Sequence, residues 1–300
     1  MPSSEKHQGN LTSLSSLDET VNFLRQISTD SISDSQRLAV LDEIAEILSH
    51  DGKLDDALCI RREEQLPICT HLGDVREWAV TMGKIADILC QRGELDEALR
   101  IRREEQLPVY ERLGDVRSRA VTMGQIADIL YQRGELDEAL RVRREEELPV
   151  YERLGDVHSR AVTMGQIADI LYQRGEHDEA LRIRREEELP VYERLGDVRS
   201  RSITLQKIAS ALLENGGMAH GRIQEIFEAL FEAYQIASRI GLPDGIAFIG
   251  IQLAQVMAIG GSKVEALAIL ETVDAAFAKL GHDDGQAAVV RLRGEIGGTA

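Results

Sequence analysis

The sequence is poor in aromatic residues and in positive charge. Phe, Trp and Tyr together make up 4% of the 300 residues. The chain has 52 acidic and 35 basic residues, which gives a net charge of −17. Nucleic-acid recognition needs a basic surface for the phosphates, and single-strand binding also uses aromatic side chains on which bases stack. Nucleic acid is therefore not expected as a partner. An acidic balance is compatible with a cationic protein partner.

Cysteine is scarce, and long apolar runs are missing. The three cysteines are an odd number at irregular spacing, which argues against a disulfide framework and fits a reducing compartment. No run approaches the roughly 18 apolar residues of a membrane-spanning helix. The first ten residues, MPSSEKHQGN, have no apolar core of the kind that a signal peptide needs. We expect a cytoplasmic protein that does not enter a membrane.

Motifs for catalysis and for metal binding are also lacking. None of the seven histidines has a partner at helical spacing or a metal-ligand pattern with Cys, Asp or Glu. No phosphate-binding glycine loop, nucleophile elbow or paired His-Glu helix motif occurs. The sequence Gly281-His-Asp-Asp-Gly285 is interpreted as a turn followed by an N-capping aspartate. We therefore predict no catalytic residue, no cofactor and no metal, and a protein that is not an enzyme.

What the chain does contain is a repeat. Gly73, Gly114, Gly155 and Gly196 are spaced 41 residues apart, and segments 114–154 and 155–195 differ at three positions only. A fixed period of this length is typical of proteins built from stacked helical or strand units. Three near-identical copies offer the same chemical groups in each repeat, whereas an active site needs different groups that converge on one atom.

One repeat can be interpreted as a pair of antiparallel helices. Asp115 is a good N-cap, and apolar residues then recur at three- and four-residue steps. Gly134 ends this helix, because glycine readily adopts the left-handed conformation of a helix end. A second helix starts at Leu136 and runs to Leu154. Each pair then needs the next pair to bury its remaining apolar side.

The spacing of Ala127, Gly134 and the Asp137-Glu138-Ala139 sequence resembles a tetratricopeptide repeat. The 41-residue period is similar to the long variety of kinesin light chains and MalT-type bacterial regulators. The resemblance covers about residues 33–297. It implies an all-α, right-handed superhelical solenoid of about six antiparallel helix pairs, with an N-terminal helix and a C-terminal capping helix.

The expected organisation has a disordered segment 1–14, an N-terminal helix and turn at 15–32, and a repeat domain at 33–297. The helix pairs of that domain are placed at 33–72, 73–113, 114–154, 155–195, 196–241 and 242–281, followed by a cap at 282–297. Four residues are inserted in the fifth pair, where Asn215–Gly221 should form a flexible loop.

The second helices contain recurring prolines and recurring Arg-Arg-Glu-Glu runs. Proline recurs inside each of them, at Pro67, Pro108, Pro149 and Pro190. Proline removes a hydrogen bond and clashes with the preceding turn, so we predict a kink or a break just before each one. The Arg-Arg-Glu-Glu runs, such as 102–105, are interpreted as an outer, solvated face.

The candidate binding residues lie on the first helices, which line the concave face in proteins that the repeat resembles. Equivalent slots give a row of carboxylates at Glu46, Asp87, Asp128 and Asp169. A companion row has Lys84, Gln125, Gln166 and Lys207, and a third has Tyr131 and Tyr172. Mid-helix Gly83, Gly124 and Gly165 are expected to let another backbone come close. The alternative is that the carboxylates form a solvated helix face that repeats because the whole unit was duplicated.

These patterns predict a non-catalytic scaffold or adaptor. Its concave groove would bind a protein or an extended peptide, with a basic or hydrogen-bonding segment as the expected occupant. The alternative is a regulatory or sensor subunit that controls an enzyme partner in a bacterial signalling or defence assembly. Such a subunit would use the end surfaces or the inserted loop, and self-association through the ends is a further possibility.

Overall fold

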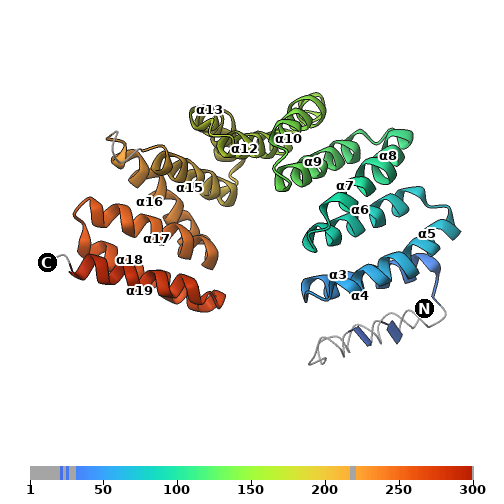
Figure 1. Ribbon diagram of the computed structural model, residues 1–300, viewed down its shortest axis with the longest axis horizontal. Coiled ribbons are helices and arrows are strands. Elements are labelled where there is room, and N and C mark those ends of the chain that lie inside the picture. Colours follow the sequence, from blue (N-terminus) through green and yellow to red (C-terminus); the bar gives the residue numbers. More distant parts are fainter. Residues whose placement is uncertain (1–20, 23–24, 27–31, 217–220, 299–300) are drawn as a thin grey trace. The chain divides into compact units, whose positions relative to one another are not determined.

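The computed structural model describes residues 21–22, 25–26, 32–216 and 221–298, and every regular element among them is a helix (Figure 1). The predicted disordered segment 1–14 and the central residues 217–220 of the inserted loop lie outside the described residues. Of the predicted N-terminal helix, the four described residues Val21, Asn22, Arg25 and Gln26 are helical. No described helix is long and apolar enough to cross a membrane.

Among the described residues, seven helices take the place of first helices; the first five begin 41 residues apart, and the other two begin after steps of 45 and 40 residues. They are α3 (Asp34–His50), α6 (Val75–Gln91), α9 (Val116–Gln132), α12 (Val157–Gln173), α15 (Val198–Glu214), α17 (Pro243–Ile259) and α19 (Asp283–Gly298). The Asp115 side chain caps α9 by accepting a 3.0 Å hydrogen bond from the Ser118 N–H. Gly134 follows α9 with φ +78°. Both ends are therefore set by the residues that the sequence pattern singles out.

The second helices of the first four pairs each have three parts, an α-helix, a π-helical segment and another α-helix. These are α4 (Leu54–Cys59), η2 (Ile60–Gln65) and α5 (Leu66–Leu72); α7 (Leu95–Arg100), η3 (Ile101–Gln106) and α8 (Leu107–Leu113); α10 (Leu136–Arg141), η4 (Val142–Glu147) and α11 (Leu148–Leu154); and α13 (His177–Ile183), η5 (Arg184–Glu188) and α14 (Leu189–Leu195). The last two, α16 (Ile223–Ile240) and α18 (Lys263–Leu280), are plain α-helices.

The π-helical segments show how these helices accommodate proline. Pro108 is the second residue of α8, and α8 begins directly after η3. Gln106 and Leu107, the two residues before the proline, keep right-handed helical dihedral angles. A break before the proline, one of the two predicted forms of distortion, is therefore wrong. The Leu107 N–H bonds to the Arg102 carbonyl five residues earlier, so the wider π turn extends to the residue before the proline. Proline cannot donate such a bond, and π segments are a known cause of local helix distortion.

The chain divides into two compact units, residues 1–142 and 143–300. In both units, alanines at the contact between first and second helices are almost completely buried. In the first unit these are Ala86, Ala98, Ala127 and Ala139, and in the second they are Ala168 and Ala180. Small side chains at these positions let the two helices of a pair approach closely. The second unit also has apolar clusters around Leu230 and Phe277.

Candidate interaction surface

Equivalent residues of the repeats share a position number, which is the number of residues after Gly73, Gly114, Gly155, Gly196 or Gly241. Positions 7, 11 and 14 of each first helix point to one side of it, because residues three and four apart share a helix face. This side is called the first-helix face. Position 14 carries the predicted carboxylates, and position 11 carries the predicted lysines and glutamines.

The carboxylate row is paired with buried arginines from the second helices. Arg61, Arg102 and Arg184 are 1–3% exposed and occupy equivalent places in the π-helical segments. Their guanidinium groups bond to Glu46, Asp87 and Asp169, respectively. The prediction that the Arg-Arg-Glu-Glu runs form an outer face is therefore wrong for the first arginine of each. The 3.6-residue period did not predict these buried arginines, because the wider π turn changes which residues face inward.

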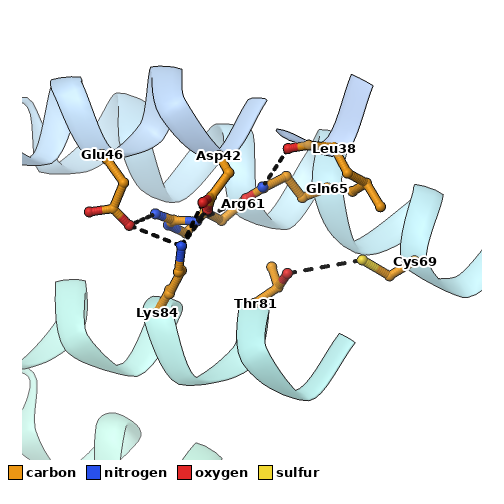
Figure 2. Close-up of polar contacts among 8 residues, drawn as sticks. All are labelled: Leu38, Asp42, Glu46, Arg61, Gln65, Cys69, Thr81 and Lys84. Atoms are coloured by element: carbon orange, nitrogen blue, oxygen red, sulfur yellow. Dashed lines mark hydrogen bonds and ion pairs between the residues drawn. The ribbon is translucent and has the colours of Figure 1, made fainter. Parts of the chain in front are cut away.

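In the first unit, Glu46 and Lys84 lie together in an ionic cluster (Figure 2). Arg61 donates from Nη2 to Glu46 Oε1 at 2.6 Å and from Nη1 to Asp42 Oδ1 at 2.8 Å. Lys84 Nζ lies 2.6 and 2.7 Å from the two Asp42 oxygens and 3.2 Å from Glu46 Oε1. Burial acts to raise the pKa of Asp42, but hydrogen bonds from Arg61 and Lys84 outweigh it and leave that pKa lowered.

The next pair repeats this arrangement with different partners. Besides Asp87, Arg102 Nη1 donates to Gln106 Oε1 at 2.8 Å and to Gln125 Oε1 at 2.6 Å. Gln125 lies on the following first helix, so one buried arginine joins three elements. Asp87 contrasts with Asp42: burial raises its pKa, and the nearby Arg102 only partly opposes this.

In the second unit, Arg184 holds Asp169 and Glu188 at 2.5 and 2.8 Å, and Lys207 Nζ lies 2.6 Å from Asp169 Oδ2. Burial raises the pKa of Glu188 despite Arg184 and a hydrogen bond from Thr204. The structure thus joins Asp169 to Lys207, two residues that the sequence analysis placed in separate rows.

The remaining candidates are more varied. Asp128 and Tyr131 are half-buried on α9. Tyr172 donates its hydroxyl to Glu214 at the end of α15, so it joins two repeats. Gln166 is half-buried, and its amide oxygen is enclosed without a hydrogen-bond partner among the described residues.

The mid-helix glycines make room for side chains from the second helix. A Cβ atom placed on Gly165 would lie 2.6 Å from Glu188 Oε1, and one on Gly83 would overlap the Gln106 amide. The prediction that another backbone approaches these two glycines is therefore wrong. Each glycine instead accommodates the Gln or Glu that the buried arginine binds.

Recesses open beside the candidate residues of the first unit. One of about 310 Å³ lies between α6 and α9, with Val80, Lys84, Val121 and Gln125 in its lining and Arg102 among the second-helix residues that also border it. A second, also about 310 Å³, is bordered by Glu46, Arg61, Lys84 and Asp87. Four of these eight residues, Val80, Val121, Arg61 and Arg102, were not predicted as binding residues.

An exposed apolar row at position 7 was not among the predicted binding residues. Val121 and Val162 are 44% and 37% exposed, and Ile203 and Phe248 are 44% and 43% exposed, while Val80 occupies the same position in α6. A signal was present in the sequence, because an aliphatic residue recurs at a position next to, and not part of, the buried face. Among the described residues, no group of three or more His, Cys, Asp or Glu side chains could hold a metal ion.

A family model described as tetratricopeptide repeat matches residues 126–145 and 167–186. No curated protein sequence matches the chain. Three similar solved structures show the same fold. A putative kinesin light chain with nearly identical repeats from Podospora anserina is 21% identical, with 67% of this chain and 95% of that one covered, at a TM-score of 0.52.

The second is a signal transduction ATPase with numerous domains that has a tetratricopeptide-repeat sensor, from Pyrococcus horikoshii. It is 14% identical at a TM-score of 0.67, and the match covers 91% of this chain but 42% of that longer protein. The third is a Rap protein complexed with competence and sporulation factor, 13% identical at a TM-score of 0.61, with 93% of this chain and 80% of that one covered. The predicted tetratricopeptide-type repeats and all-α solenoid class are confirmed.

Proposed function

We propose that this tetratricopeptide-repeat protein is a non-catalytic interaction scaffold whose first-helix face binds a segment of a partner protein. The observation that carries the proposal is the apolar row at position 7 of the second unit, where Val162, Ile203 and Phe248 on α12, α15 and α17 stay 37–44% exposed. Exposed apolar side chains that recur on one face are typical of interaction sites. In the first unit, Val80 and Val121 at the same position border the recess between α6 and α9.

The similar structures support a role in protein interaction or regulation. The Rap structure is a complex with competence and sporulation factor. The Pyrococcus horikoshii protein is described as using its tetratricopeptide repeats as a sensor. These functions belong to those proteins, and the low identities transfer only the fold.

A regulatory subunit that binds through its C-terminal end is the second candidate. An apolar recess of about 390 Å³ in the second unit is lined by Leu213, Ile259, Leu292 and Ile296 with other residues of α17, α18 and α19. Ile259 at its border is 64% exposed. A recess of this size and apolar character can hold a partner's side chains. Ile259→Glu should then abolish partner binding, while changes on the first-helix face should have no effect.

The scaffold proposal can be tested by selecting phage-displayed random 12-residue peptides on the immobilised chain. Enriched peptides should lose binding to the double variant Val121→Glu/Ile203→Glu, which places charges on the first-helix face of each unit. The matched control is Val116→Glu/Val198→Glu, at position 2 of the same helices, where the valines are 46% and 42% exposed. If no peptide discriminates between these variants, the first-helix face is not the binding surface.

A further inference from the structure

We propose that the second unit has another interaction surface, which binds an amphipathic helix of a partner protein through aliphatic side chains and carboxylates of that helix. This surface lies at the ends of the second helices and not on the first-helix face, so the proposal goes beyond the scaffold function. It consists of four exposed residue pairs, each a basic residue followed by an aliphatic one. They are Arg153–Leu154, Arg194–Leu195, Arg239–Ile240 and Lys279–Leu280, and they are called the turn edge.

The first step is that the aliphatic side chains of the turn edge are 38–49% exposed. Each one is followed by a glycine with positive φ that ends the helix. A left-handed glycine is a usual helix end, and a basic residue in the last turn interacts favourably with the helix dipole. Neither role requires an exposed aliphatic side chain. Exposed aliphatic residues that recur along one edge are typical of interaction sites.

The second step is that the pattern does not follow from duplication of one unit. Helices α16 and α18 contain neither the recurring proline nor a π-helical segment, and their sequences differ from those of the near-identical repeats. They nevertheless end in Arg239-Ile240-Gly241 and Lys279-Leu280-Gly281. The sequence of a basic residue, an aliphatic residue and glycine is therefore present even where the rest of the second helix has diverged.

The third step concerns the charges that are available to a partner. Glu193, directly before Arg194, lies 3.4 Å from Arg201 and forms its ion pair there. In the part of the chain that the structure describes, Arg194, Arg239 and Lys279 have no ion pair. A carboxylate from a partner can therefore pair with these cations without displacing an existing partner.

The pattern of charge around the turn edge favours a protein over a membrane surface. Asp197, Asp244 and Asp283 lie at the start of the first helices that follow, so negative charges alternate with the basic residues. A continuous anionic surface would meet these aspartates as well as the cations. A protein can place its carboxylates opposite individual cations, and such charge complementarity selects one partner over another.

The fourth step is the spacing along the edge. Lys207 Nζ on α15 lies 2.6 Å from Asp169 on α12, and Gln252 on α17 donates to Ser210 on α15 at 3.2 Å. Successive first helices are thus in contact, and packed helices lie about 8–10 Å apart. Seven residues of an α-helix span about 10.5 Å. A partner helix with an aliphatic residue and a carboxylate in each heptad would present one of each to every helix pair.

The test is a selection on the immobilised full chain from phage-displayed 21-residue helices that are randomised at two positions of each heptad on one face. The enriched helices should carry an aliphatic residue at one position and Asp or Glu at the other. Fluorescence anisotropy with a synthetic enriched helix should give a Kd that is at least about tenfold higher for Arg194→Glu/Arg239→Glu, because attraction becomes repulsion. Leu195→Gln/Ile240→Gln should have a similar effect, because apolar contact is lost.

Two matched variants make the same chemical changes elsewhere in the second unit. Arg222→Glu/Arg291→Glu reverses two exposed arginines, and Val264→Gln/Val290→Gln replaces two valines that are 78% and 64% exposed. Both should change the Kd less than about twofold, since these residues lie outside the turn edge. Melting followed by circular dichroism shows that each variant folds.

The inference is separable from the proposed function. Val121→Glu/Ile203→Glu should leave the Kd of the enriched helix unchanged, and a loss of binding in that variant alone would place the helix on the first-helix face and overturn the inference. Enriched helices that are basic or uncharged on the randomised face would also overturn it, as would a selection that enriches none. Binding of the chain to phosphatidylserine vesicles that is lost in Arg194→Glu/Arg239→Glu would overturn it in favour of a membrane surface.

Discussion

At the scale of single residues, the buried arginine is the feature that most changes the interpretation of the repeat. Arg102 is 1% exposed and bonds to Asp87, Gln106 and Gln125, while the next residue, Arg103, points to solvent. Arg102→Met should lower the free energy of unfolding by about 2 kcal/mol, because Gln106 loses its donor inside the protein. Urea unfolding would measure this.

Arg103→Met is the matched control, since it removes the same charge from the same helix. It should change the free energy of unfolding by less than about 0.5 kcal/mol, as is usual for surface substitutions. Equal losses for the two variants would mean that net charge, and not the buried contacts, determines the effect.

Replacing the mid-helix Gly165 by Ala should lower the free energy of unfolding, which is opposite to the usual effect of this substitution. Gly→Ala inside a helix usually stabilises by up to about 1 kcal/mol. Gly165→Ala should instead destabilise by about 1–2 kcal/mol, because its Cβ would lie 2.6 Å from Glu188 Oε1, which accepts a bond from Thr204 while Arg184 holds Oε2 of the same carboxylate. Gly294→Ala in α19, where nothing lies within 4 Å, is the control and should stabilise in thermal melts.

Glu188 should make stability depend on pH. Burial raises its pKa, so the folded chain binds this proton more tightly than the unfolded chain does. The corresponding stability is present in acid and is lost as the pH rises from about 4.3 through the raised value. Glu188→Gln copies Gln106 of an earlier repeat and should remove this dependence.

At pH 7, Glu188→Gln should be at least as stable as the parent chain in urea unfolding, because Gln can still accept a bond from Arg184. A loss of more than about 1 kcal/mol would show that the Arg184–Glu188 ion pair stabilises the fold after its desolvation cost. Denaturation at several pH values between 4 and 8 compares the two chains directly.

The sequence predicted much at this scale, and its failures have one origin. Asp115 and Gly134 act as predicted because a cap depends on a few neighbouring residues. The burial of Arg102 depends on the π turn that contains it, and the role of Gly83 depends on a side chain 23 positions later. A fixed 3.6-residue period represents neither the wider turn nor the long-range contact.

At the scale of elements, the recurring proline and the π segment belong together. Four second helices contain both, whereas α16 and α18 contain neither. The sequence located each distortion from the proline alone, but its form depends on the competition between a break and a wider turn. The wider turn keeps the helix continuous. The buried Arg and the buried Gln or Glu lie within the π segment itself.

The N-terminal cap of α19 differs from the aspartate caps of α6, α9, α12 and α15. The N-capping aspartate predicted after Gly281 is wrong, because His282 occupies the cap position and its Nδ1 accepts a 2.9 Å bond from the Gly285 N–H. His282→Ala should lower the melting temperature through loss of about 1 kcal/mol of capping energy. His282→Asp introduces the N-cap residue type of α6, α9, α12 and α15 and should recover most of this loss.

The His282 ring also packs 5.4 Å from the ring of Phe277, so the two substitutions separate capping from packing. Equal losses for Ala and Asp would mean that the aromatic contact, and not the hydrogen bond, stabilises this end. Thermal melts followed by circular dichroism at pH 8 provide the comparison.

At the scale of the whole molecule, the repeat explains why near-identical surfaces serve different contacts. Position 11 is Lys84 in one repeat and Gln125 in the next, and each bonds to a group of the preceding pair. The sequence placed this position in a companion row beside the carboxylates on the first helices. It could not show that the charges there are already paired, because the partners lie one repeat away.

The net charge of −17 leads to the last prediction. Like charges destabilise the compact state, and salt screens exposed charges more than buried pairs such as Arg184–Glu188. The melting temperature should therefore rise by a few degrees, on the order of 1 kcal/mol, when NaCl increases from 0.1 to 1 M and the screening length falls from about 10 to 3 Å. KCl should have the same effect, because screening does not depend on the cation. A steady fall with salt would mean that the exposed ion pairs between repeats outweigh the overall repulsion.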